Sequence, residues 1–142
     1  MRRILFAAAV GAVIGAGGFS LANQGDRGAQ AVRRLSERDI IETLNGKDAR
    51  VTTVELSLGP GAAGRPHRHP GPVFGYVLEG EFELGIDDQP VKTLKAGETF
   101  YEPGGALHRV SRNPSAKDKT RVLAVLVHPR DAKELAVPAD KE

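Results

Sequence analysis

The sequence has 142 residues and a formal net charge of +2 at pH 7, with 20 basic and 18 acidic side chains. This length accommodates one domain, and the absence of cysteine excludes a disulfide framework, a zinc–thiolate site and thiol catalysis. The 17 glycines and 9 prolines indicate a chain with many turns, which favours short strands over long helices.

The start of the chain has the pattern of a secretory signal peptide. Two arginines follow the first methionine, an uncharged apolar run covers residues 4–18, and the small residues Ser20 and Ala22 mark a cleavage site. We therefore expect residues 1–22 to be removed and the mature protein to begin at Asn23, in the periplasm or outside the cell. The alternative is an uncleaved membrane anchor, but the apolar run is shorter than the about 20 residues of a membrane-spanning helix.

Removal of this leader changes the charge balance of the chain. The leader carries two arginines and no acidic residue, so the remaining chain carries 18 basic and 18 acidic side chains. A formally neutral domain gives no electrostatic reason to expect binding to nucleic acid or to a membrane surface. We therefore expect no nucleic-acid partner and no stable membrane association after cleavage.

Residues 23–49 are predicted to form an N-terminal linker or arm. Residues 23–36 are polar and contain glycine, which indicates a linker or an extended segment. Residues 36–44 combine a serine suited to capping a helix with spaced apolar residues, so a short helix and an edge strand both remain open there.

Residues 50–128 are predicted to form a β-barrel domain of short strands. Turns rich in glycine, proline or aspartate separate alternating, often β-branched runs. Strands that recur about every 8 to 12 residues predict an all-β sandwich or barrel. The charged residues 129–142 are expected to form a C-terminal tail that is a short helix or disordered. The predicted strands are 51–58, 74–78, 81–86, 91–94, 99–102, 107–110 and 121–128.

Three of the four histidines, His67, His69 and His108, form a candidate metal site. In an extended segment residues i and i+2 point to the same face, so His67 and His69 can reach one point in space. His108 follows a Pro-Gly-Gly turn that brings a second strand into place. Three imidazoles with open positions beside them are a familiar catalytic-metal arrangement. An isolated H-x-H pair is more often part of a polar loop, so the flanking pattern carries the assignment.

That flanking pattern resembles both motifs of the cupin superfamily. Gly61-x5-His67-x-His69-x3-Val73-x6-Gly80 resembles the first motif, and Gly97-x5-Pro103-x-Gly105-x2-His108 resembles the second. The resemblance covers residues 50–128 and implies an all-β cupin-type double-stranded β-helix, or jelly-roll barrel. It also implies that His67, His69 and His108 bind one divalent transition metal ion. Fe(II) is our first choice, with Zn, Ni, Mn and Cu as alternatives.

One position departs from the family pattern. The family usually carries a glutamate, its fourth metal ligand, where this chain has Val73. Valine cannot coordinate a metal and no acidic residue lies within two positions, so the sequence predicts three ligands. Three neutral imidazoles leave the ion its full charge, which favours an anionic chelating ligand such as an enolate, catecholate or carboxylate.

Other side chains are weaker candidates for a role at the site. Glu102 is expected to be an exposed or structural carboxylate, with a role as a base or as a partner of a metal ligand as the alternative. His128 is expected at the rim of the barrel, and Arg68 is expected to face away from the two ligands beside it. The candidates for core, interface or substrate pocket are Tyr76, Phe82, Phe100 and Tyr101.

These features lead to two functional hypotheses for an exported metal-binding protein. The first is a non-haem, metal-dependent, dioxygenase-like enzyme that acts on a small oxygenated substrate, which rests on fold analogy. The second is a non-catalytic periplasmic module that binds or senses a metal or a small ligand, and the absence of an obvious general base favours it. In both hypotheses the binding partner of the protein is a small molecule. The resemblance also implies a homodimer, with the N-terminal arm available for strand exchange.

Overall fold

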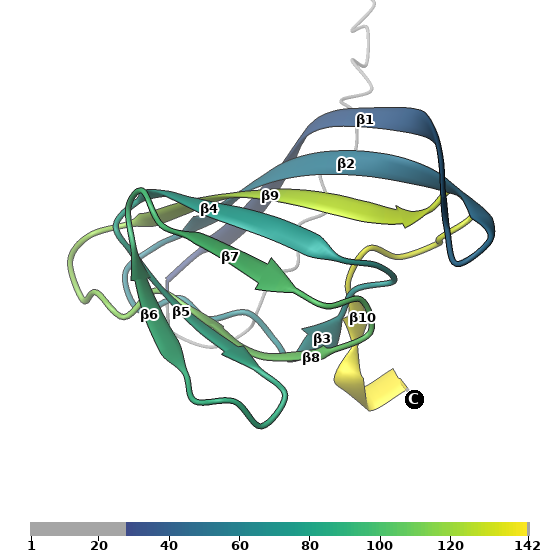
Figure 1. The fold of residues 1–142 in the computed structure, drawn as a ribbon. Helices are drawn as coiled ribbons and strands as arrows, with labels where there is room; N and C mark the ends of the chain where they lie inside the picture. The colour runs from purple at the N-terminus through teal and green to yellow at the C-terminus, as the bar shows by residue number, and fades with distance from the viewer. Residues whose placement is uncertain (1–27, 142) are drawn as a thin grey trace, which may run out of the picture.

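The computed structural model describes residues 28–141 of the chain (Figure 1). The predicted signal peptide and its cleavage site lie outside these residues. Within residues 28–141 the structure has no helix that is long and apolar enough to cross a membrane. The helix that these residues do form is the short 3-10 helix η1 (Ala139–Lys141).

Residues 28–141 form two five-stranded antiparallel sheets, which we call the upper and lower sheets after their places in Figure 1. The all-β fold predicted from the sequence is confirmed, and the two sheets form the jelly-roll barrel. The strands of the upper sheet are, in order, β1 (Gln30–Leu44), β2 (Lys47–Leu58), β9 (Thr120–Pro129), β4 (Val73–Glu79) and β7 (Thr99–Glu102). Those of the lower sheet are β10 (Val137–Pro138), β3 (His67–Arg68), β8 (Leu107–Arg112), β5 (Glu81–Ile86) and β6 (Lys92–Lys95).

Strands form near both ends of the described chain. Strand β1 runs along β2 at the edge of the upper sheet, so residues 30–36 form the extended segment that the sequence left open beside a linker. The edge-strand alternative holds for residues 36–44. Most side chains of β1 are exposed because an edge strand needs only its backbone to pair. The C-terminal tail is neither disordered nor only a helix, because it forms β10 and then η1.

The hydrophobic core lies between the two sheets. Along β4 the side chains alternate between a buried inner face and an exposed outer face, which is the period of two that a strand imposes. Phe82 lies in the core and Phe100 packs beside it, with their ring centroids 5.5 Å apart. Tyr76 and Tyr101 instead lie on the outer face, where they are 41% and 54% exposed. The buried core residues are Leu58, Ala62, Val77, Phe82, Leu84, Ile86 and Val122.

Candidate metal centre

The structure brings His67, His69 and His108 together. His67 lies in β3 directly opposite His108 in β8, and their ring centroids are 4.9 Å apart. His69 follows β3, and its ring centroid lies 4.7 Å from that of His67. One potential ligand atom from each histidine lies within 4.8 Å of the other two. The pairing of β3 with β8 therefore places the two histidine-containing motifs at one point.

A glycine turn before β8 sets the position of His108. Gly105 adopts a positive φ of 78°, which costs glycine little. Its backbone N–H donates to the carbonyl of His69 at 2.9 Å, and its own carbonyl accepts from the Arg68 guanidinium at 2.9 Å. Arg68, expected to face away from the ligands, therefore helps to fix the turn that leads into the His108 strand.

Backbone carbonyls orient the rings of His67 and His69. The Nδ1 of His67 donates to the carbonyl of Arg65 at 2.8 Å, and the Nδ1 of His69 donates to the carbonyl of Leu135. A carbonyl can only accept, so each Nδ1 carries the ring proton. Burial lowers the pKa of His67 to about 4 and also lowers the pKa of His69, so both rings are neutral at pH 7.

The remaining nitrogens of these two rings face each other. The Nε2 atoms of His67 and His69 are 3.0 Å apart. Because each ring has its single proton on Nδ1, both Nε2 atoms present lone pairs and neither can donate to the other. The two lone pairs repel each other, and a cation between them would attract both. Imidazoles whose second nitrogen donates to a backbone carbonyl are also typical of metal sites.

His108 supplies independent support for a metal at this point. It is 4% exposed, its Nε2 is buried without a hydrogen-bond partner among residues 28–141, and its Nδ1 lies 3.0 Å from a Glu102 oxygen. A buried polar atom without a partner costs about 1 to 3 kcal/mol. The three side chains therefore fit a divalent transition metal ion, for which imidazole is a common ligand.

Glu102 lies inside this site and is not exposed, so its position matches the alternative of a carboxylate beside a metal ligand. The residue is 4% exposed, and its Oε2 lies 3.0 Å from His108 Nδ1 and 3.6 Å from His69 Nε2. Burial alone would raise the pKa of Glu102, but the neighbouring His108, His69 and His67 outweigh burial and lower it. The carboxylate is therefore ionised at pH 7. Alternation along β7, with Phe100 also facing inward, is the sequence signal that would have placed Glu102 inside.

Val73 and Glu102 are neighbours on the inner face of the upper sheet. The two residues are directly opposite each other in the β4–β7 pair, and Val73 is 2% exposed. The position at which the family resemblance implies a carboxylate therefore lies beside a carboxylate from another strand.

His128 lies apart from the three-histidine group, although it is not at an exposed rim. It is 4% exposed, its Nε2 lies 2.9 Å from Thr52 Oγ1, and its Nδ1 lies 2.9 Å from the carbonyl of Pro129. Both ring nitrogens have partners, so His128 is a buried structural histidine within the upper sheet.

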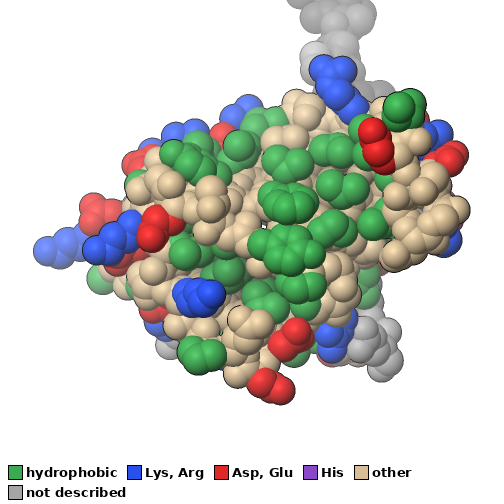
Figure 2. All heavy atoms as spheres, viewed as in Figure 1, with side chains coloured by type: hydrophobic (Ala, Val, Ile, Leu, Met, Phe, Trp, Pro, Cys, Tyr) green, Lys and Arg blue, Asp and Glu red, His purple; other side chains and the backbone are tan. Residues whose placement is uncertain are grey.

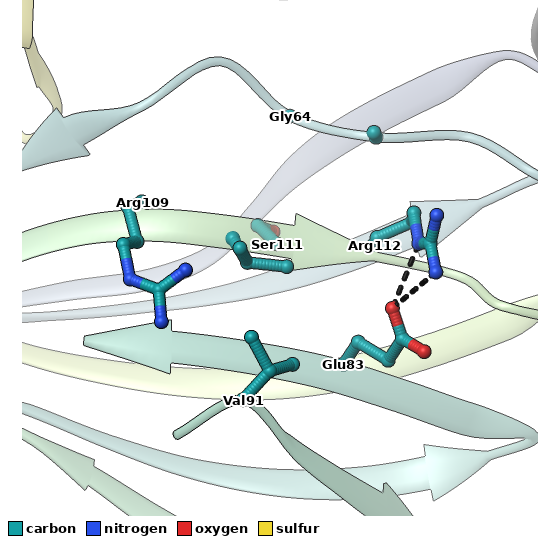
Figure 3. Close-up of a pocket in the computed structure, with 8 residues that line it drawn as sticks. Gly64, Glu83, Val91, Arg109, Ser111 and Arg112 are labelled. Atoms are coloured by element: carbon teal, nitrogen blue, oxygen red, sulfur yellow. Dashed lines mark hydrogen bonds and ion pairs between the residues drawn. The ribbon is translucent and has the colours of Figure 1, made fainter. Parts of the chain in front are cut away.

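The hollow shown in Figure 3 is a different place on the molecule. It is lined by residues of β5, β8 and the neighbouring loops, among them Glu83, Arg109 and Arg112, and by none of the three histidines. Arg112 pairs with Glu83 at 2.6 Å, and Arg109 donates to the carbonyls of Asp87 and Gln89. Because both guanidinium groups bind their own chain, this hollow offers no free cation for a ligand.

Comparison with protein families and curated proteins identifies relatives of this chain. The family model described as a cupin domain matches residues 54–126, which is just over half of the chain. Germin-like protein subfamily 2 member 4 of Arabidopsis thaliana is 33% identical over 79 residues, which cover 52% of this chain and 36% of the relative. Subfamily 2 member 2 of the same plant is 37% identical over 68 residues, which cover 44% of this chain and 31% of the relative. The chain thus spans about a third of the length of these proteins.

Solved structures share the fold. A recombinant oxalate oxidase in complex with glycolate has a TM-score of 0.54 and 25% identity, and the match covers 73% of this chain and 53% of that chain. A cupin superfamily protein from Desulfitobacterium hafniense has a TM-score of 0.56 and 14% identity, over 80% of this chain and 99% of that chain. The DMSP lyase DddQ from Ruegeria pomeroyi has a TM-score of 0.54 and 18% identity, and the match covers 65% of this chain and 44% of that chain.

Proposed function

This chain belongs to the cupin superfamily, and from that premise we propose that it is an exported, metal-binding, dioxygenase-like enzyme that acts on a small oxygenated substrate. One observation carries the proposal: His67, His69 and His108 converge, and the unprotonated Nε2 atoms of His67 and His69 face each other. These three side chains would hold one divalent ion. Fe(II) is the proposed ion, with Zn, Ni, Mn and Cu as alternatives.

The protein's own residues define what kind of ligand the site would take. When bound, Fe(II) supplies redox chemistry with O₂, whereas Zn or Ni would supply Lewis acidity. The ionised Glu102 lowers the net charge of a divalent site from +2 to +1, so the attraction for an anionic ligand is weaker than three imidazoles alone would give. A small anion with two oxygen donors still fits this charge. The glycolate in the oxalate oxidase complex, a small hydroxy acid, supports this substrate class.

The test of this function is aerobic O₂ uptake by the Fe(II)-loaded protein. The substrate panel contains hydroxy acids, diketones, catechols and thiols, and the His67→Ala variant serves as the metal-binding control. We expect uptake with at least one class of substrate in the unchanged protein and none in the variant. Full Fe(II) occupancy without uptake on any member of the panel would refute the enzymatic function.

The alternative is a non-catalytic periplasmic module that binds or senses a metal or a small ligand. The enclosure of the site favours it, because the side chains of His69 and Glu102 are only 13% and 5% exposed. This module would bind the metal without consuming O₂. Binding of a panel member to the loaded protein with no turnover is the result that distinguishes it from the enzyme.

Export is proposed from the leader pattern alone. The basic start, the apolar run over residues 4–18 and the small residues before Asn23 support cleavage after Ala22. We expect mass spectrometry of the exported protein to give a mature chain that begins at Asn23. An intact Met1 in the exported protein would contradict this.

We also propose that the protein forms a homodimer through the outer face of the upper sheet. Phe74, Tyr76 and Leu78 of β4 and Tyr101 of β7 form an apolar patch, in which each residue is between 38% and 54% exposed. Figure 2 shows hydrophobic side chains gathered over the middle of this face, where Figure 1 draws β4 and β7. A contiguous exposed apolar patch marks an interaction surface, and a second copy of the chain offers the same patch.

A further inference from the structure

We propose that Glu102 is the fourth metal ligand, supplied by β7 in place of the glutamate that the family carries at the position of Val73. The inference deepens the proposed function and rests on the three-histidine site. It assigns a ligand from outside the first motif, in which the family's carboxylate is normally found.

The distances around Glu102 are those between donors on one ion. Its Oε2 lies 3.0 Å from His108 Nδ1 and 3.6 Å from His69 Nε2, and His69 Nε2 lies 3.0 Å from His67 Nε2. Two donors that each bind one ion at about 2.1 Å lie about 3.0 to 3.4 Å apart, depending on the angle between them. All three distances lie within or close to this range.

A competing role for Glu102 is that of an outer partner that accepts a hydrogen bond from His108. The position of Oε2 argues against it. Oε2 lies 3.6 Å from the Nε2 of His69 as well as 3.0 Å from the Nδ1 of His108. This Nε2 faces the ion position because the Nδ1 of His69 donates to the Leu135 carbonyl. A carboxylate behind His108 would not lie near the ion-facing nitrogen of His69.

The sheet register explains why a carboxylate on β7 can take the place of one on β4. Val73 and Glu102 are directly opposite on neighbouring strands, where Cβ atoms are about 4.5 to 5.5 Å apart. A glutamate at either position can therefore reach the same point between the sheets. Two glutamates directly opposite each other would repel, so one carboxylate at this pair of positions is sufficient.

Glu102 is also buried among the histidines. It is 4% exposed, and its ionic partners within residues 28–141 are the imidazoles of His69 and His108. Carboxylate and imidazole groups both bind divalent transition metals, so an ion held by the three histidines would lie within reach of this carboxylate.

The test measures Zn(II) affinity by calorimetry, because Zn(II) needs no oxidant and reports binding without activity. The variants are Glu102→Gln, the double variant Val73→Glu/Glu102→Gln, and His67→Ala. The control is Glu81→Gln, which changes an exposed glutamate of β5. We expect Glu102→Gln to weaken binding at least about 100-fold, at or beyond the upper end of the 10- to 100-fold loss typical of an outer partner. The double variant should restore most of this loss, and Glu81→Gln should bind as the unchanged protein does.

The outcomes separate this inference from the proposed function. If His67→Ala abolishes binding while Glu102→Gln binds within threefold of the unchanged protein (about 0.7 kcal/mol), the three-histidine site stands and the fourth ligand is refuted. If His67→Ala also binds normally, the proposed metal site itself is refuted. A crystal structure of the Zn(II)-loaded protein provides a second measurement. A Glu102 oxygen at about 2.0 to 2.2 Å from the ion is expected, and a carboxylate bonded only to His108 would overturn the inference.

Discussion

At the scale of single residues, the partner of one ring nitrogen decides what the other nitrogen can do. The Nδ1–H groups of His67 and His69 each donate a hydrogen bond to a backbone carbonyl, and the Nε2 atoms point toward the site. His128 instead has Thr52 and Pro129 on its two nitrogens and has no lone pair to spare for an ion. The same residue type therefore has two different roles within one barrel.

Replacement of single histidines tests this division. His67→Ala, His69→Ala and His108→Ala should each remove most bound metal, because each loses one of the converging ligands. His128→Ala should keep the metal but destabilise the fold by about 1 to 3 kcal/mol, because the Thr52 hydroxyl is left buried without its partner. Elemental analysis and urea unfolding measure the two effects. Metal content that is indifferent to the first three changes would refute the site.

The stability of the metal-free protein should decrease in acid. Burial lowers the pKa of His67 to about 4 in the folded state, whereas an unfolded histidine has a pKa of about 6.5. Between these pH values the unfolded chain binds a proton at His67 and the folded chain does not. The contribution of His67 to the free energy of unfolding is therefore largest above pH 6.5 and decreases as the pH falls toward 4. The loss from His67 is at most about 3 kcal/mol.

Urea unfolding of the metal-free protein at pH 7.5 and pH 5 measures this loss. His69, whose pKa burial also lowers, contributes in the same direction. The His67→Gln variant is the matched control and should show a smaller difference between the two pH values. Equal stability of the unchanged protein at both values would contradict the prediction.

At the scale of strands, the C-terminal segment belongs to the candidate site. Strand β10 pairs with β3, with Val137 opposite Arg68 and Pro138 opposite His67. Ala139 also donates its N–H to the carbonyl of Pro66 at 3.2 Å. This two-residue strand covers the edge of the strand that carries His67, and the segment before it supplies the Leu135 carbonyl to His69.

Truncation after Lys133 tests this role of the C-terminal segment. The shortened chain should still fold, because none of the residues of the buried core cluster lies beyond Lys133. Its Zn(II) affinity should fall by about 10- to 100-fold, because His69 loses the carbonyl that orients it. Calorimetry measures the affinity. Removal of only residues 140–142, which leaves β10 in place, is the matched control and should have little effect.

At the scale of the whole molecule, the two faces of the upper sheet carry different groups of residues. The inner face of β4 and β7 carries Val73 and Glu102 at the candidate site, and the outer face carries the apolar patch. Because successive side chains of a strand point to opposite faces, the patch can change without altering the site.

The double variant Phe74→Lys/Tyr76→Lys should therefore convert the proposed dimer into a monomer with unchanged metal content. Light scattering at micromolar concentration gives the mass of the particle. Ile41→Lys is the control, because Ile41 is 97% exposed in β1 and lies outside the patch. A monomeric mass for the unchanged protein would refute the homodimer.

The sequence by itself determined the all-β fold, most of the strand positions within residues 50–128 and the set of three histidines. These features depend on local rules: side chains alternate along a strand, and glycine and proline mark turns. The resemblance of the two histidine-containing motifs to those of the cupin superfamily implies which barrel the strands form.

The tertiary structure decided the features that depend on pairing between distant segments. Glu102 and Val73 are 29 positions apart in the chain, and only the β4–β7 register makes them neighbours. Strand β1 lacks an alternating burial pattern because it lies at an edge, and β10 has two residues, too few to show any periodicity. Local pattern therefore could not predict the candidate carboxylate ligand or the strand that covers the candidate site, because both depend on backbone pairing between segments far apart in the sequence.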